Sequence, residues 1–208
     1  LGVVGSDPDH FECPRCGAHD RERHLLLYIR ATGLFDKLHG MRVLHFAPER
    51  RLWPRIAAAT PAEYIRCDLF PAAPDVVKVD IESMPFADEA FDLVIANHVL
   101  EHVRDDGKAV REVARVLAPG GFAILQTPYS GKLQRTWQDD GIDTPQARLQ
   151  AYGQEDHVRL FGRDIFERIA GAGFEPHVRR HEEVLGGVDP VAAGVNASEP
   201  FFLFRKPG

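Results

Sequence analysis

From Gly40 to the end of the chain, short apolar runs alternate with longer amphipathic stretches. The strands of a parallel sheet are buried on both faces and are joined by helical crossovers, so this alternation is typical of such a sheet. The predicted strands are 42–46, 62–67, 76–79, 91–96, 122–126 and a closing pair at the sheet edge, 177–180 and 201–204. The expected fold class is therefore α/β, with a doubly wound, mostly parallel sheet.

Three stretches have the apolar spacing of helices. One runs from Ala109 to Leu117 and is expected to stop at the Pro119–Gly121 turn. Another covers about 163–170, and the stretch 21–38 predicts one or two helices with Asp20 as N-cap. We therefore expect two parts, a small N-terminal segment (1–39) and a single α/β domain (40–208).

The charge of the chain limits its partners. Acidic residues outnumber basic ones by 31 to 25, which gives a net charge of −6. A negative surface repels phosphate and anionic lipid, so we expect neither a nucleic acid nor a membrane partner. No apolar run approaches the roughly 18 residues that cross a bilayer, and the first ten residues lack the features of a secretory signal. A cytoplasmic location is expected.

Polar residues follow four of the predicted strands, where ligands of parallel sheets bind. They are His45 to Glu49 after the first strand, then Asp68-Leu69, Asp80-Ile81 and Asn97-His98. Asp68 comes about 20 residues after the first strand-to-helix turn, the position at which a carboxylate binds a ribose diol. Singly, Asp68 and Asp80 could equally cap helices. Together with Asn97 they favour a nucleotide-derived cofactor.

Three further segments carry a family resemblance. The runs VDIESMPFADEAFDLVI (79–95), HVLEH (98–102) and RVLAPGG (115–121) resemble the class I S-adenosylmethionine-dependent methyltransferases, in a type 11-like branch. The resemblance covers Gly40 to the C-terminus, including the segment EDHVRLF (155–161). It implies a Rossmann-like, seven-stranded sheet with one antiparallel strand near the edge, and S-adenosylmethionine as cofactor.

The resemblance also implies roles for the residues at the strand ends. Asp68 would bind the ribose hydroxyls and Leu69 the adenine face, while Asp80 would meet the adenine amino group and Ile81 the ring. Asn97 and His98 would lie near the methionine portion, and the first loop would contribute His45, Phe46, Ala47 and Glu49. This loop departs from the family because it has no glycine; Glu49 is expected to supply the carboxylate for the cofactor's ammonium group.

The acceptor side is less defined by the sequence. Tyr129, His157 and Arg159 are expected near the acceptor mouth, where a cationic pair favours an anionic small molecule or peptide that is methylated on oxygen. In-line transfer needs mainly proximity and orientation, with His98, His102 or His157 removing a proton from a hydroxyl acceptor. The loop 130–152 reads as a mobile lid or an oligomer contact, and the oligomeric state stays open.

Two other functions compete with methyl transfer. The segment from His98 to His102 fits the pattern H-x-x-E-H, in which two histidines on one helical face hold zinc in a metallopeptidase. A non-catalytic member of the fold is the other alternative.

The N-terminal segment carries a separate metal signal. Cys13 and Cys16 form one zinc knuckle, which would need His10, His19, His24 or an upstream second knuckle to complete a structural site; otherwise the turn is metal-free.

Overall fold

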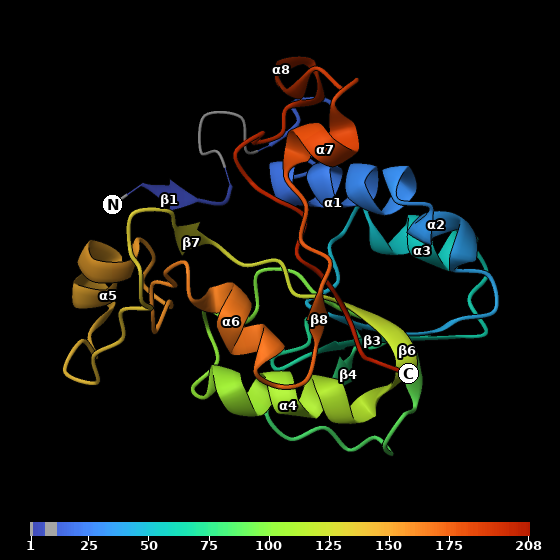
Figure 1. Cartoon of the computed structure of the whole chain (residues 1–208), viewed down its shortest axis with the longest axis horizontal. Coiled ribbons are helices and arrows are strands. Elements are labelled where there is room, and N and C mark those ends of the chain that lie inside the picture. Colours follow the sequence, from blue (N-terminus) through green and yellow to red (C-terminus); the bar gives the residue numbers. More distant parts are fainter. Residues whose placement is uncertain (1, 7–11) are drawn as a thin grey trace.

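The computed structural model describes residues 2–6 and 12–208. A seven-stranded sheet forms its centre, in the order β4-β3-β2-β5-β6-β9-β8 (Figure 1). The strands are β2 (Arg42–Phe46), β3 (Glu63–Asp68), β4 (Val77–Lys78), β5 (Phe91–Ala96), β6 (Leu117–Ile124), β8 (Glu175–Pro176) and β9 (Leu203–Arg205). β9 runs antiparallel to both of its neighbours, whereas the pairs from β4 to β6 are parallel. This confirms the expected mostly parallel sheet with one antiparallel strand near the edge.

β6 begins earlier than the sequence pattern predicts. Helix α4 (Asp106–Val116) ends where the backbone becomes extended at Leu117, and β6 starts at that residue. The Pro119–Gly121 run, expected to be a turn after the helix, therefore lies within the strand. Gly121 is required there, because a Cβ atom would come within 3.0 Å of the Asp92 carbonyl oxygen on β5.

Helices cover both faces of the sheet, and each face has its own apolar core (Figure 1). α4 and α6 (Ile165–Ala170) pack on one face through Val113 and Ile169. The other face carries α1 (Asp20–Ala31), α2 (Leu34–Lys37), α3 (Trp53–Ala58) and α7 (His181–Leu185). Leu25 and Ile29 of α1 share a core with β2 and β5, so the N-terminal segment packs directly on the sheet; the division at residue 39 stays a prediction.

α1 begins with a capping box. The N-cap is His19, one residue before the predicted Asp20, and the carboxylate of Glu22 accepts a hydrogen bond from the main-chain N–H of His19 at 2.7 Å. Asp20 is instead the first helical residue and is buried. The helix start is displaced by one residue because Glu22, three positions after His19, completes the box.

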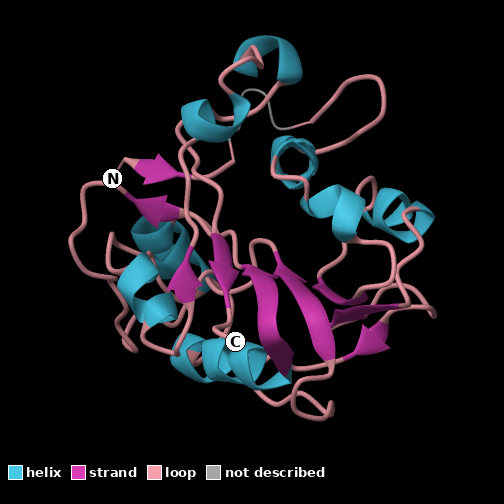
Figure 2. Cartoon of the chain, turned by 45° about the vertical axis from the view of Figure 1, so that its right-hand side comes forward, coloured by secondary structure: helices cyan, strands magenta, loops and turns pink. Residues whose placement is uncertain are grey.

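The stretch 130–152, expected to be a mobile lid or an oligomer contact, contains a helix that was not predicted from the sequence. Helix α5 (Pro145–Tyr152) starts at Thr144, whose hydroxyl accepts a hydrogen bond from the main-chain N–H of Ala147. β7 (Tyr129–Ser130) pairs with β1 (Val3–Val4), and Figure 2 shows this small sheet set apart from the main one. A last helix, α8 (Pro190–Ala193), precedes β9. Among the described helices, none has the length and apolar character to cross a membrane.

Candidate active site

The loop after β2 begins with a left-handed residue. Ala47 has φ of 46°, and its main-chain N–H donates to the carbonyl oxygen of Cys67 at the end of β3. Side chains other than glycine rarely adopt this conformation because Cβ crowds the backbone. The glycine-free loop thus makes a glycine-like turn at a conformational cost.

Glu49 lies at the centre of this loop. One carboxylate oxygen accepts a hydrogen bond from Nδ2 of Asn97, and the other lies 2.9 Å from Nε2 of His45, whose Nδ1 hydrogen-bonds the Tyr64 hydroxyl. Burial raises the pKa of Glu49, but the contacts with His45 and Asn97 outweigh it and hold the pKa below its usual value. Glu49 is therefore a largely enclosed anion, with its side chain 9% exposed, next to the carboxyl end of β5.

A cavity of about 420 Å³ lies between this loop and the N-terminal segment. Glu22 joins its two walls, because its carboxylate accepts hydrogen bonds from the main-chain N–H groups of His19 and Arg51. The lining residues are Glu12, Cys16, Gly17, His19, Arg21, Glu22, Ala47, Glu49, Arg50 and Arg51. Of the four predicted first-loop residues, Ala47 and Glu49 line this cavity, whereas His45 and Phe46 are buried behind it.

Asp68 and Asp80 stand at the same edge of the sheet. Oδ1 of Asp68 accepts a hydrogen bond from the main-chain N–H of Phe70, and Oδ1 of Asp80 accepts one from Glu82, both at 2.8 Å. Within the part of the chain that the structure describes, Oδ2 of each carboxylate has no hydrogen bond. Each aspartate can thus accept a further hydrogen bond from a ligand.

Apolar side chains flank these carboxylates. Leu69 is 45% exposed and Phe70 is 79% exposed, which is unusual for large apolar groups and suits a flat ring that would cover them. Ile81, expected against such a ring, is instead buried in the core. Sequence reasoning missed Phe70, although its place directly after Asp68-Leu69 was a usable signal.

His98 is held between two carboxylates after β5. Its φ is 55°, its Nδ1 lies 3.3 Å from Oε1 of Glu101, and its Nε2 lies 3.6 Å from Oε1 of Glu199. Burial lowers the pKa of His98, but the two carboxylates raise it to about 9, and the pKa of each glutamate falls to about 2. His98 is therefore an imidazolium at neutral pH, which argues against its expected role as a base.

Glu199 continues this polar chain toward the N-terminal segment. Its Oε2 lies 3.3 Å from Nδ1 of His24, and Nε2 of His24 lies 2.9 Å from Nδ1 of His181. The hydroxyl of Tyr28 donates to the main-chain oxygen of Glu199 at 2.6 Å. No sequence motif marked Glu199, which reaches the site only because the fold brings the end of the chain beside α1.

The Cys13–Cys16 turn does not gain a ligand from His24, which is engaged with Glu199 and His181. Within residues 2–6 and 12–208, no group of three metal-binding side chains includes either cysteine. His10 lies outside the described residues. Main-chain N–H groups of Arg15 and Cys16 lower the pKa of Cys13, as a knuckle would, and zinc at this turn stays a prediction.

The H-x-x-E-H segment is a series of turns rather than a helix. The metallopeptidase hypothesis required His98 and His102 on one helical face, and the structure does not have that arrangement. His98 instead faces Glu101 and Glu199, while Nδ1 of His102 lies 3.3 Å from Asp156. The His102 and His157 rings meet edge to face, with 4.8 Å between their centroids.

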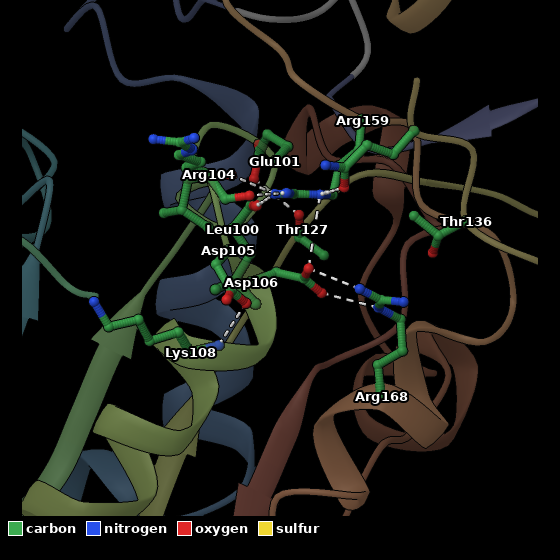
Figure 3. A network of polar contacts seen from close by, with 12 residues as sticks. Leu100, Glu101, Arg104, Asp105, Asp106, Lys108, Thr127, Thr136, Arg159 and Arg168 are labelled. Atoms are coloured by element: carbon green, nitrogen blue, oxygen red, sulfur yellow. Dashed lines mark hydrogen bonds and ion pairs between the residues drawn. The ribbon is translucent and has the colours of Figure 1, made fainter. Parts of the chain in front are cut away.

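Arg159 is in the interior, not at the acceptor mouth as expected. Its side chain is 1% exposed and points into the turn after β5 (Figure 3). It donates hydrogen bonds to the carbonyl oxygens of Leu100, Val103 and Arg104, at 2.6–2.8 Å, and to Gln138 at 2.9 Å. The guanidinium therefore holds the turn together and is not directed at a substrate.

Tyr129 also differs from its expected place. Its ring packs on Phe166 and Phe202, with centroids 5.4 Å and 5.8 Å away, at the margin of the apolar core. Of the three residues expected at the acceptor mouth, His157 lies beside His102 and Glu101, with one potential ligand atom from each of the three residues within 4.8 Å of the others.

Known proteins resemble this chain in sequence and in fold. Residues 39–125 match a family model described as a methyltransferase domain. A malonyl-[acyl-carrier protein] O-methyltransferase of Pseudescherichia vulneris is 39% identical over 70 residues, which cover 32% of this chain and 28% of that protein. The chain spans about a quarter of the length of curated relatives that it matches.

Solved structures share the fold at low sequence identity. The 1,6-didemethyltoxoflavin-N1-methyltransferase of Burkholderia thailandensis has a TM-score of 0.59 at 16% identity, over 90% of this chain and 78% of that one. The [4+2]-cyclase SpnF has a TM-score of 0.58 at 18% identity, over 86% and 81% of the two chains. Residues 39–125 of this chain are thus similar to a methyltransferase domain, and the chain shares the fold of these two solved structures.

Proposed function

We propose that the protein transfers a methyl group from S-adenosylmethionine to a small-molecule acceptor. The observation that carries this proposal is the placement of Asp68, Leu69 and Asp80 at one edge of the sheet, with a carboxylate oxygen of each aspartate open to a ligand. Ligands of parallel sheets bind at this edge. Carboxylates there can accept hydrogen bonds from ribose hydroxyls and from the adenine amino group.

The first loop suits the other end of the same ligand. Glu49 is an anion at the cavity wall and would face the ammonium group of a bound amino acid. Asn97, whose Oδ1 is buried without a hydrogen-bond partner among the described residues, lies beside it and could accept a hydrogen bond from the same group. These side chains fit an adenosine that carries a positively charged amino-acid tail.

The protein's own contribution would be orientation and exclusion of water. S-adenosylmethionine supplies an already activated methyl group, so no nucleophile is required from the chain. For a hydroxyl acceptor, His157 is better suited than His98 to take the proton, because burial lowers the pKa of His157 and keeps its ring neutral. His102, whose side chain is 34% exposed, is the second candidate. A carboxylate acceptor would need neither.

An oxygen acceptor is favoured, and a small molecule is preferred to a peptide. The matched relative from Pseudescherichia vulneris is named as an O-methyltransferase of an acyl-carrier protein, whereas the toxoflavin enzyme is named for a small molecule methylated on nitrogen. Arg159 was expected to bind an anionic acceptor, but its guanidinium donates hydrogen bonds to main-chain carbonyl oxygens instead. His102 and His157 are the remaining groups that could bind such an acceptor.

Calorimetry with S-adenosylmethionine and S-adenosylhomocysteine tests the proposal. Asp68→Ala should weaken binding of both by about 1.5–3 kcal/mol, or roughly 10- to 150-fold, because a charge-assisted hydrogen bond is lost. Asp36→Ala, an exposed aspartate on α2, is the matched control and should bind normally. Unchanged affinity in Asp68→Ala would refute the assignment. Tight binding without turnover in a screen of hydroxyl and carboxylate acceptors would instead favour the non-catalytic alternative.

A further inference from the structure

We propose that Glu101, His102 and His157 form a binding site for a divalent transition-metal ion. Each of these residues offers one ligand atom, and the three atoms lie within 4.8 Å of one another. Two imidazoles and one carboxylate are the donor set of zinc and of non-haem iron, cobalt or manganese sites that keep open positions. The site is distinct from the Cys13–Cys16 turn and from the H-x-x-E-H zinc arrangement, because His98 is not one of its ligands.

The spacing of the ligands is close to that of a loaded site. Nε2 of His102 lies 3.9 Å from Oε1 of Glu101. Metal–ligand bonds of about 2.0–2.1 Å in a tetrahedral site place ligand atoms roughly 3.3 Å apart. The three ligand atoms lie within 4.8 Å of one another, so side-chain rotations that bring them up to about 1.5 Å closer would complete three of the four positions around zinc.

The carboxylate of Glu101 has one oxygen without a hydrogen bond. The residue is 1% exposed, and its Oε2 accepts a hydrogen bond from the Thr127 hydroxyl at 2.8 Å. Its Oε1 is buried and has no hydrogen-bond partner within the described parts of the chain, although the ring of His98 lies 3.3 Å away. The contact with His98 therefore leaves Oε1 without a hydrogen-bond donor among the residues that the structure describes, so this oxygen can still bind a cation at the three-residue cluster.

The surroundings hold the ligands in place. Nδ1 of His102 lies 3.3 Å from the carboxylate of Asp156, which leaves Nε2 directed toward Glu101. Carboxylates orient metal-binding histidines in this way. The main-chain N–H of Val158 donates to the carbonyl oxygen of Glu101 at 3.0 Å, so the segment that carries His157 is fastened to the turn that carries the other two ligands.

The site is open on one side. Three protein ligands leave at least one position for water or an oxygen ligand, and the His102 side chain is 34% exposed, so a small molecule can approach. If the proposed methyl transfer is correct, the ion would bind the acceptor oxygen and favour its deprotonated form. This use of the ion rests on the proposed function, whereas metal binding itself does not.

The site is tested by cobalt binding to the chelator-treated full chain. Binding is measured by visible absorption and calorimetry in the absence of S-adenosylmethionine. We expect one ion per chain, with ligand-field absorption and without the near-ultraviolet charge-transfer band that thiolate ligands produce. His157→Ala and His102→Ala should each weaken this binding at least about tenfold. His177→Ala, an exposed histidine that contacts Phe122, is the matched control and should bind normally.

Further variants and measurements distinguish cobalt binding at Glu101, His102 and His157 from metal binding elsewhere in the chain and from methyl transfer. A Cys13→Ser/Cys16→Ser double variant should keep the cobalt absorption, and its loss in that variant alone would overturn the proposal. Wild-type affinity in His102→Ala, whose side chain is 34% exposed, would also overturn the proposal. The lack of saturable cobalt, zinc and manganese binding by the unaltered protein would do the same. Calorimetry with S-adenosylmethionine on the same metal-free samples reports the proposed function independently.

Discussion

Replacing Arg159 by alanine should destabilise the protein strongly. The guanidinium donates to three main-chain carbonyl oxygens, those of Leu100, Val103 and Arg104, in the turn that follows β5. It also lies 3.8 Å from the carboxylate of Asp106, which Arg168 binds through two hydrogen bonds (Figure 3). Its removal leaves several of these acceptors without a donor.

These contacts set limits on the expected loss in the free energy of unfolding. An unsatisfied buried polar group costs about 1–3 kcal/mol, and removal of one partner from a buried charged cluster typically costs about 3–5 kcal/mol. Water that enters the vacated space would satisfy part of the deficit. We therefore expect a loss of about 3–5 kcal/mol, a large fraction of the roughly 5–15 kcal/mol that stabilises a domain.

Urea unfolding followed by circular dichroism measures this loss. Arg159→Lys should recover part of it, because lysine keeps the charge and three donors but lacks the planar fork. Arg104→Ala, at an exposed position in the same turn, should change the free energy of unfolding by less than about 0.5 kcal/mol. A loss below about 1 kcal/mol in Arg159→Ala, with an unchanged denaturant dependence, would refute the structural role.

Three further results are expected. Ala47→Gly should raise the free energy of unfolding by about 1 kcal/mol because it relieves the left-handed backbone at φ 46°; a lower urea midpoint would contradict this. Stability should be highest between about pH 5 and 6.5. Folding lowers the pKa of Glu101 and of Glu199 from 4.5 to about 2, so their ionised forms stabilise the fold fully above about pH 4.5. This stabilisation is lost as the pH falls toward 2. Folding raises the pKa of His98 from 6.5 to about 9, so the protonated ring stabilises the fold fully below pH 6.5. This stabilisation is lost as the pH rises through 9. A urea midpoint that stays constant to pH 10 would count against the ion pairs of His98. Thr144→Ala should remove about 1 kcal/mol from α5, visible as roughly fivefold faster amide exchange confined to that helix.

The strands at the centre of the sheet could be predicted from the sequence alone. β2 and β5 have the expected bounds because each carries apolar residues on both faces, such as Val43 and Leu44 in β2 and Leu93 and Val94 in β5, as burial on two sides requires. Helix α5 was not predicted from the sequence because only Ala151 and Tyr152 of this helix are buried, so the helix has no apolar stripe. Thr144-Pro145 was nevertheless a usable signal for a helix start. The predicted start of β6, residue 122, is too late because the Pro119–Gly121 run resembles the end of a helix.

The positions of the candidate site residues could be predicted where residues follow a strand directly, and not where they come from distant segments; their roles stay predictions. Asp68 and Asp80 lie where the sequence placed them, at the strand ends. Arg159 was misplaced because its burial depends on carbonyl groups of the turn after β5, which no local pattern reveals. Glu199 was missed for the same reason, since it faces His98 and His24 only in the folded chain.

The beginning and end of the described chain are fastened to each other. Arg23 donates hydrogen bonds to the carbonyl oxygens of Ala193 and Gly194, and the Asn196 side chain donates to the carbonyl oxygen of Gly5. On a ribosome, α1 therefore emerges long before the C-terminal segment that Arg23 and Tyr28 bind, although its apolar partners on β2 follow it closely. Contacts of such large sequence separation slow folding and prolong exposure to aggregation. The contacts of Arg23 and Asn196 can form only when the C-terminal segment has been synthesised.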